Sequence, residues 1–226
     1  MRSSHRRLSG TAITSCVRNI TSANKAPGGF GLGIPANLAN GDVNERHGNG
    51  FYEWGSIKPK NAPTLLRGEG TYMYMFEFGD DAGFTQIMGC YIQTSPGLIC
   101  RQAFAKSGGV QFAEWEWVNP PMNLNTEYRT TERYMGKPVY VKVVDCGKCP
   151  GSEFKDIRFD TSGVALPIRC YGNWTYDGRS TIPFETTGSD RMVVGIIGRF
   201  IRITTGGRNF SDRTCTVTVY YTKTTD

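Results

Sequence analysis

The chain has 226 residues, a mass of 25.1 kDa and a formal net charge of +6, which suits one large or two small domains with cores of their own. Its Lys and Arg residues are interspersed with Asp and Glu and form no basic run, a distribution that argues against nucleic-acid binding. No apolar stretch approaches the roughly 18 residues of a membrane-spanning helix, so we expect no membrane insertion.

The first half of the sequence predicts an arm, a loop-rich segment and then short strands. Residues 1–23 lack periodicity and predict a flexible or partner-dependent arm, and residues 25–42 are too rich in Gly and Pro for a long regular element. Segment 71–78 (TYMYMFEF) then alternates, with its aromatic residues on one face and Met and Glu on the other. Further strands are predicted at 84–92, 98–105 and 110–118.

The second half continues this pattern after Asn119-Pro120-Pro121, where two prolines favour a domain boundary. Short alternating or apolar runs predict strands at 137–145, 151–160, 164–170, 192–197, 200–204 and 214–221. Helix signals are nearly absent. The sequence therefore predicts an all-β protein with an arm at 1–23, a first domain at 24–118 and a second at 119–226.

Several motifs, in this order along the chain, resemble those of phage tail fibres. Segments APGGFGLG (26–33), GDVNERHGNGFYEWGSIKPKNAP (41–63) and FAEWEWV (112–118) resemble the knob module of phage tail fibres and R-type pyocins, although the closing tryptophans are spaced i, i+2 where that module tends to have Trp-x-x-Trp. The matching residues are Gly50, Phe51, Tyr52, Asn61, Ala62, Pro63, Trp115 and Trp117. Residues 127–147 and 201–223 resemble the two ends of a C-terminal domain found on phage tail and receptor-binding proteins.

The resemblance implies a small knob-like β module followed by a β-sandwich-like receptor-binding domain, in a parallel homotrimer whose C-terminal domains contact the host. The expected function is to recognise a bacterial surface glycan or outer-membrane protein. The protein would be made in the host cytoplasm and carried on the virion, attached to other tail or capsid proteins through the arm. The alternatives are a head-fibre or baseplate decoration that binds no receptor, and a bacteriocin or lectin tip.

Two predicted loops carry the candidate receptor-binding residues. Segment 171–181 (YGNWTYDGRST) lies between strand signals, and its aromatic and polar side chains could stack on sugar rings and bind hydroxyl or acidic groups. Segment 204–214 has a similar polar character. The candidate residues are Asn173, Trp174, Tyr176, Asp177, Arg179, Arg208 and Asn209. The structural alternative is that Trp174 packs inward or against a neighbouring subunit, and that the second loop is a solvated hairpin end.

Residues suited to metal binding or catalysis are few. Cys146 and Cys149 form one C-x-x-C pair, no second pair exists, and both histidines lie in the other half, so we expect no metal and no cofactor. Seven dispersed cysteines favour free thiols. Glu114 and Glu116 would share a strand face, but solvent-facing carboxylates explain them better than a catalytic pair. The sequence predicts a protein that is not an enzyme.

The aromatic residues of the knob-like segment are predicted to be structural. Phe51, Tyr52 and Trp115 have the size and the setting of core side chains in a small β module. We expect them to pack in the core and not to form a ligand platform.

Overall fold

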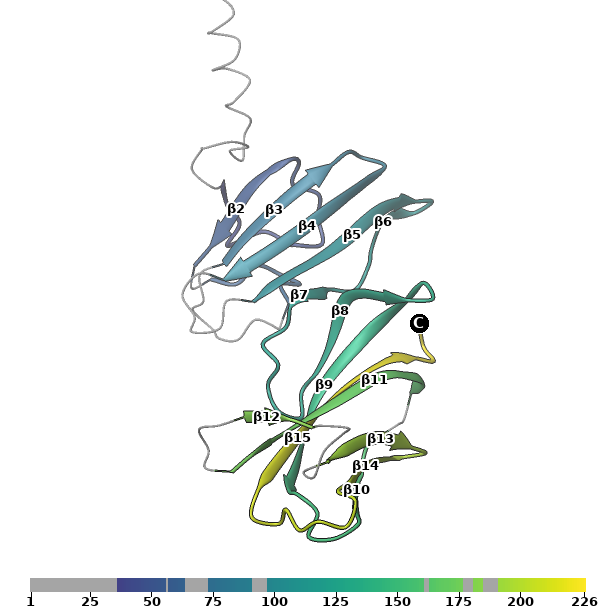
Figure 1. Cartoon of the computed structure of the whole chain (residues 1–226). Helices are drawn as coiled ribbons and strands as arrows, with labels where there is room; N and C mark the ends of the chain where they lie inside the picture. The colour runs from purple at the N-terminus through teal and green to yellow at the C-terminus, as the bar shows by residue number, and fades with distance from the viewer. Residues whose placement is uncertain are drawn as a thin grey trace, which may run out of the picture. The chain divides into compact units, whose positions relative to one another are not determined.

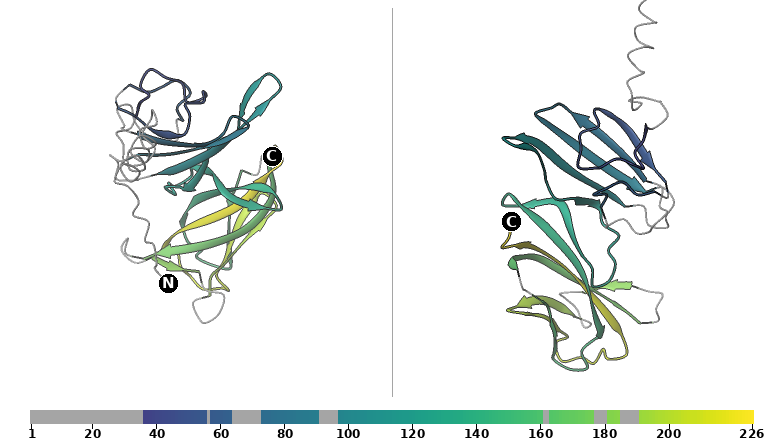
Figure 2. Two further views of the ribbon diagram at one scale, coloured as in Figure 1. Left: turned by 90° about the horizontal axis from the view of Figure 1, so that it is seen from above. Right: turned by 180° about the vertical axis from the view of Figure 1, so that it is seen from behind.

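The computed structural model describes residues 36–55, 57–63, 73–90, 97–160, 163–176, 181–184 and 191–226, and its regular elements there are all β-strands (Figures 1 and 2). The predicted all-β class is confirmed. None of the described segments forms a helix long and apolar enough to cross a membrane. The predicted arm at 1–23 and the candidate residues Asp177 and Arg179 lie outside the described residues.

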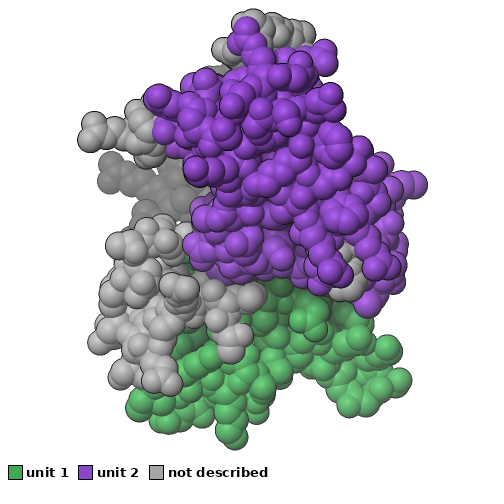
Figure 3. Space-filling model, turned by 90° about the horizontal axis from the view of Figure 1, so that it is seen from below, with its two compact units in different colours: residues 1–115 green, residues 116–226 purple. Residues whose placement is uncertain are grey.

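The chain divides into two compact units, Met1–Trp115 and Glu116–Asp226, coloured separately in Figure 3. The division falls a few residues before the Asn119-Pro120-Pro121 segment. Its position follows from β7 (Glu116–Asn119), in which Trp117 pairs in parallel with Thr130 of the second unit. Trp117 is 2% exposed and meets the Tyr128 ring edge-on, so this tryptophan packs against a residue of unit 2.

Unit 1 is a sheet in the order β1-β2-β3-β4-β5, with β6 also paired to β5. Its strands are β1 (Ala36–Asn37), β2 (Gly50–Trp54), β3 (Met73–Gly79), β4 (Gly83–Cys90), β5 (Leu98–Lys106) and β6 (Gly109–Phe112). β1 runs parallel to β2, and the other pairs are antiparallel. The turn between β3 and β4 needs glycine at position 79, where φ is 139° and a Cβ would lie 2.4 Å from the Gly83 carbonyl oxygen.

The alternation along β3 decides which face of the unit 1 sheet is buried. Met73, Met75 and Glu77 are at most 4% exposed, whereas Phe78 on the opposite face is 39% exposed. The aromatic face of β3 is therefore the more open one. Of the three predicted core aromatics, Tyr52 is buried, and Phe51 and Trp115 are half-buried.

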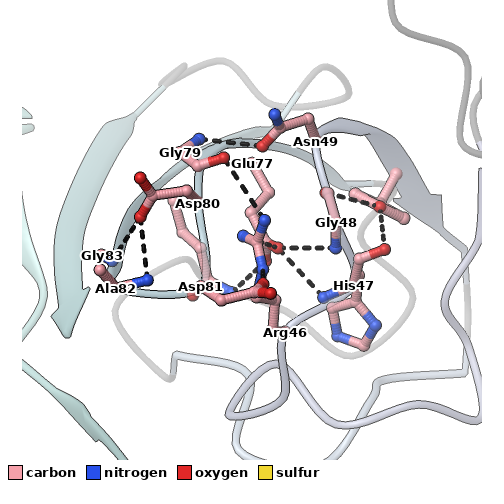
Figure 4. A network of polar contacts seen from close by, with 12 residues as sticks. Arg46, His47, Gly48, Asn49, Glu77, Gly79, Asp80, Asp81, Ala82 and Gly83 are labelled. Carbon is pink, nitrogen blue, oxygen red and sulfur yellow. Dashed lines mark hydrogen bonds and ion pairs between the residues drawn. The ribbon is translucent and has the colours of Figure 1, made fainter. Parts of the chain in front are cut away.

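Glu77 joins the strands of unit 1 to the loop that precedes β2 (Figure 4). Its carboxylate accepts hydrogen bonds from the backbone N–H groups of His47 and Gly48 at 3.0 and 2.9 Å and from the Gln86 side chain at 2.9 Å. Arg46 completes the network with an ion pair of 3.5 Å. A carboxylate that is 0% exposed is tolerated because donors surround it.

Arg101 interrupts the strand predicted at 110–118. The chain leaves β6 after Phe112 and resumes in β7, and the rings of Phe112 and Trp115 lie against the Arg101 guanidinium at 4.2 and 4.3 Å. Burial lowers the pKa of Arg101 to about 10. The prediction of one continuous strand was wrong: residues 113–115 lie outside both strands, and the rings of Phe112 and Trp115 pack against the buried Arg101. Glu114 is consequently exposed, whereas Glu116 is buried, so the two carboxylates do not share a face.

Unit 2 contains two sheets, in the orders β7-β8-β9-β15-β11-β12 and β10-β14-β13. After β7, the strands are β8 (Glu127–Tyr134), β9 (Lys137–Lys148), β10 (Phe154–Arg158), β11 (Val164–Thr175), β12 (Thr181–Pro183), β13 (Val193–Ile197), β14 (Phe200–Thr204) and β15 (Thr214–Lys223). The last strand, yellow in Figures 1 and 2, lies between β9 and β11.

One apolar core holds the two sheets of unit 2 together. Val217 and Val219 of β15 and Ile201 and Ile203 of β14 are all 0% exposed and belong to the same cluster. Two sheets that share one core in this way form a β-sandwich, as the resemblance to phage tail proteins implied for the second domain.

Strand β11 is longer than predicted and includes residues expected to be a loop. Its pairing with β15 continues to Thr175 opposite Thr214, so 171–175 belong to the sheet. Gly172 does not break the strand; a Cβ there would lie 2.2 Å from the Phe184 ring, which packs on the glycine. The loop prediction for this part was wrong because the glycine makes room for an aromatic ring and does not mark a turn.

Candidate functional site

The end of β11 and the segment before β15 come together at one end of the unit 2 sheet. Trp174 pairs with Cys215, and Thr175 with Thr214. Arg213, which precedes β15, therefore lies beside the C-terminal end of β11. The guanidinium carbon of Arg213 lies 3.9 Å from the centre of the Trp174 ring. Two candidate segments far apart in the sequence therefore form one site.

Three aromatic rings surround Arg213. Besides Trp174, the Phe210 and Tyr176 rings have their centres 4.6 and 5.9 Å from the guanidinium carbon. Phe210 is 2% exposed, and its N–H donates to the Pro150 carbonyl at 3.0 Å, which anchors the segment in the core. We call Trp174, Tyr176, Phe210 and Arg213 the aromatic–arginine cluster.

The charge of Arg213 lacks a close hydrogen-bonded partner. Its Nε and Nη1 atoms are buried without a hydrogen-bond acceptor. The nearest carboxylate oxygen, Oδ1 of Asp212, is 3.8 Å from Nε, which is an ion-pair distance and too long for a hydrogen bond. A buried donor left without an acceptor costs about 1–3 kcal/mol. The cluster thus holds a positive charge whose hydrogen-bonding capacity is unused.

The predicted residues divide between this cluster and its surroundings. Tyr176 is 64% exposed, whereas Trp174 is half-buried and packs against the unit 2 core, so it is not the exposed loop residue we expected. Asn173 projects to the opposite face of β11, because neighbouring residues of a strand alternate. Arg208 and Asn209 are exposed, and the Asn209 side chain accepts a hydrogen bond from the Ser211 N–H at 2.9 Å, which stabilises the turn.

Asn173 lies on the sheet face that carries Tyr171 and Tyr220. The two tyrosine hydroxyls are 3.2 Å apart, and the guanidinium carbon of Arg169 lies 4.0 Å from the Tyr220 ring centre. Arg169 in turn donates two hydrogen bonds of 2.8 Å to the carboxylate of Glu132. Arg169, Tyr171 and Tyr220 on this face are already hydrogen-bonded, unlike Nε and Nη1 of Arg213.

Sequence reasoning missed the parts played by Arg213 and Phe210. Both stand in segment 204–214, and the only local signal was an arginine beside the start of a predicted strand. Which strand pairs with β15 cannot be read from that segment. The neighbourhood of Trp174 and Arg213 is a consequence of the β11–β15 register.

A third cysteine joins the C-x-x-C pair. Cys146, Cys149 and Cys215 belong to the same buried core cluster, and all three are at most 3% exposed. Interaction with the Cys215 thiol lowers the pKa of Cys146 and raises that of Cys149, while interaction with Cys146 raises the pKa of Cys215 to about 12. Within the described residues, no three His, Cys, Asp or Glu side chains converge so as to hold a metal ion.

We expect these buried thiols to resist alkylation. In native protein at pH 8, iodoacetamide should modify Cys146, Cys149 and Cys215 more than about tenfold more slowly than the half-buried Cys100, because reagent reaches them only after local opening. Peptide mass spectrometry measures the four rates. Unfolding in guanidinium should remove the difference. Equal labelling of Cys215 and Cys100 in native protein would contradict the buried arrangement.

Comparisons with known proteins give one structural likeness. No family model matches the chain, and no curated protein is significantly similar to it. Among solved structures, it is similar to an N-truncated R2-type pyocin tail fibre with 11% sequence identity, over 85% of this chain and 99% of that chain. The TM-score is 0.28. At these values the likeness carries no argument about function, which rests on the residues of this chain.

Proposed function

We propose that this chain is a virion protein of the tail-fibre type, and that unit 2 binds a bacterial surface glycan through the aromatic–arginine cluster. The observation that carries the proposal is the meeting of Trp174, Tyr176 and Arg213 at one end of the sheet. Aromatic faces stack on the apolar faces of sugar rings, and arginine donates hydrogen bonds to their oxygen atoms. The resemblance of residues 24–226 to tail-fibre motifs supports the same role.

The proposed role is binding without catalysis. Residues 1–23 would attach the chain to another tail or capsid protein of the virion, and the protein would be made in the cytoplasm of the host. If the protein bound no bacterial strain in the experiment below, that result would favour the alternative role, a virion decoration that binds no receptor.

Tyr176→Ala is expected to weaken binding to host cells without lowering stability. Tyr176 is 64% exposed, so its removal costs little packing, while loss of one aromatic contact to a ligand costs about 1–2 kcal/mol, or roughly 5- to 30-fold in affinity. Flow cytometry of labelled protein on a panel of bacterial strains measures binding. Tyr134→Ala is the matched control, since Tyr134 is also exposed on unit 2 but lies outside the cluster. Equal binding by both variants would argue against the site.

We also propose that the protein is a homotrimer. The open face of the unit 1 sheet carries a row formed by Phe51, Phe76 and Ile87, and beyond it Phe78 and Phe104 are 39% and 44% exposed. An aromatic sheet face of this kind is a common subunit contact. Mass photometry is expected to give three times the 25.1 kDa chain mass. A stable monomer at micromolar concentration would contradict the proposal.

A further inference from the structure

We infer that the ligand of the aromatic–arginine cluster carries an oxyanion, a carboxylate or a phosphate, and that Arg213 binds it. The inference rests on the proposed glycan-binding function and adds the chemical class of the group recognised. It follows from how Arg213 is held and from what it lacks.

The rings hold Arg213 by its faces. With the Trp174 ring centre at 3.9 Å and that of Phe210 at 4.6 Å, the flat guanidinium lies against aromatic surfaces. Guanidinium N–H groups lie in the plane of the group, so a stacked arginine keeps its donors for a partner at its edge. Phe210 is anchored in the core, which fixes the arginine before any ligand arrives and reduces the entropy lost on binding.

Two other arginines of unit 2 show what a stacked guanidinium binds in this fold. Arg169 lies 4.0 Å from the Tyr220 ring centre and donates two hydrogen bonds to Glu132. Arg202 lies 4.3 Å from the Phe154 ring centre and donates two bonds of 2.7 Å to Asp156. In both cases, an aromatic ring packs against the face of the guanidinium and a carboxylate accepts hydrogen bonds at its edge.

Arg213 has the stacked rings without the bidentate carboxylate. Nε and Nη1 have no acceptor, and Asp212, 58% exposed and 3.8 Å away, does not supply one. The arginine side chain is 22% exposed. The largely exposed Tyr176 lies just beyond the end of β11, with its ring centre 5.9 Å from the guanidinium carbon, where it could also contact a ligand. A ligand oxyanion at the exposed part of the guanidinium would accept charge-assisted hydrogen bonds from one edge of the group, as the carboxylates do at Arg169 and Arg202.

The test compares ligands that differ only in the anionic group. Isothermal titration calorimetry would use a hexuronic-acid oligosaccharide and its carboxyl-reduced neutral form, and lipopolysaccharide before and after enzymatic dephosphorylation. We expect at least one acidic ligand to bind about tenfold more tightly than its neutral counterpart. The first pair reports a carboxylate and the second a phosphate. Equal affinity within both pairs would overturn the inference.

Variants assign any preference to Arg213. Arg213→Gln and Arg213→Met, the second of which keeps an apolar stem against Trp174, should abolish the preference for the acidic ligand. Arg199→Gln removes the same charge from the exposed β13–β14 turn and should leave the preference intact. A loss of equal size in Arg199→Gln would show a general effect of net charge and would overturn the assignment.

A measurement on the unmodified protein covers the case in which neither variant folds. Phenylglyoxal modifies accessible arginine, and mass spectrometry locates the adducts. The acidic ligand should protect Arg213 and leave Arg199 reactive; no protection of Arg213 would overturn the inference. If the protein adsorbed to cells and Arg213 had no role in that binding, the oxyanion inference would be wrong and the proposed function would stand. If Arg213 instead bound the acidic ligand but the protein adsorbed to no bacterium, the proposed function would be wrong.

Discussion

Glu77→Ala is expected to destabilise unit 1 by about 3–5 kcal/mol, the cost of breaking a buried network of charges and hydrogen bonds. The side chain is 0% exposed and accepts from the backbone N–H groups of His47 and Gly48 (Figure 4), and also from Gln86. Alanine would leave the part-buried N–H groups of His47 and Gly48 without this acceptor and Gln86 with the Val43 carbonyl alone. The partner Arg46 would lose one of its two carboxylates. The loop before β2 would then lose its attachment to the middle of the sheet and keep the contacts of Arg46 and Asn49 with Gly79 at the end of β3.

The change should be local as well as large. Hydrogen exchange measured by mass spectrometry should rise in residues 46–48, which the Glu77 carboxylate contacts, and chemical denaturation would give the loss of stability. Glu45→Ala is the control, since Glu45 lies in the same loop and is exposed. Glu77→Gln keeps one acceptor oxygen and should cost less than Glu77→Ala. A loss below about 1 kcal/mol for Glu77→Ala would show that the network contributes little.

Tyr221→Ala should destabilise unit 2 by about 3–5 kcal/mol, the usual cost of truncating a large core aromatic residue. Tyr221 is 2% exposed, stacks on Tyr140 with ring centres 6.0 Å apart and meets Phe159 edge-on at 5.6 Å. Its hydroxyl donates to the Glu127 carboxylate, and burial raises its pKa well above the ordinary value. Alanine would remove the ring contacts and leave a cavity between the two sheets.

The neighbouring residue provides a matched control. Tyr220 projects to the other face of β15 and is only half-buried, so Tyr220→Ala should cost roughly 1–2 kcal/mol. Urea denaturation of both variants measures the difference. Similar losses at the two positions would mean that the core does not lie on the side of β15 that carries Tyr221.

The last strand shows what the residue pattern of a single segment can predict. Segment 214–221 alternates Thr with Cys and Val, and β15 buries Cys215, Val217 and Val219 as that pattern requires. The all-β class was predictable for the same reason, since side chains alternate between faces with a period of two along any strand. Phe200–Thr204 was predicted with the bounds that β14 has.

The alternation of residues along a strand could not predict which polar residues are buried. The alternation of β3 separates two faces but does not say which is covered, and the aromatic face proved more open than the one with Glu77. Glu77 is buried because residues 47 and 48 supply donors from a distant loop. In the same way, Trp115 packs on Arg101 and lies outside the strand that the alternation had predicted.

The sequence by itself determined the strand-rich class, most strand positions in the second half and a short set of candidate residues. Only the tertiary structure decided that Trp174 and Arg213 form one site, that Asn173 faces away from it, and that Cys215 joins Cys146 and Cys149. The physical reason is that strand pairing and register depend on contacts between segments far apart in the chain. A local pattern fixes the face on which a side chain lies, and pairing fixes its neighbours.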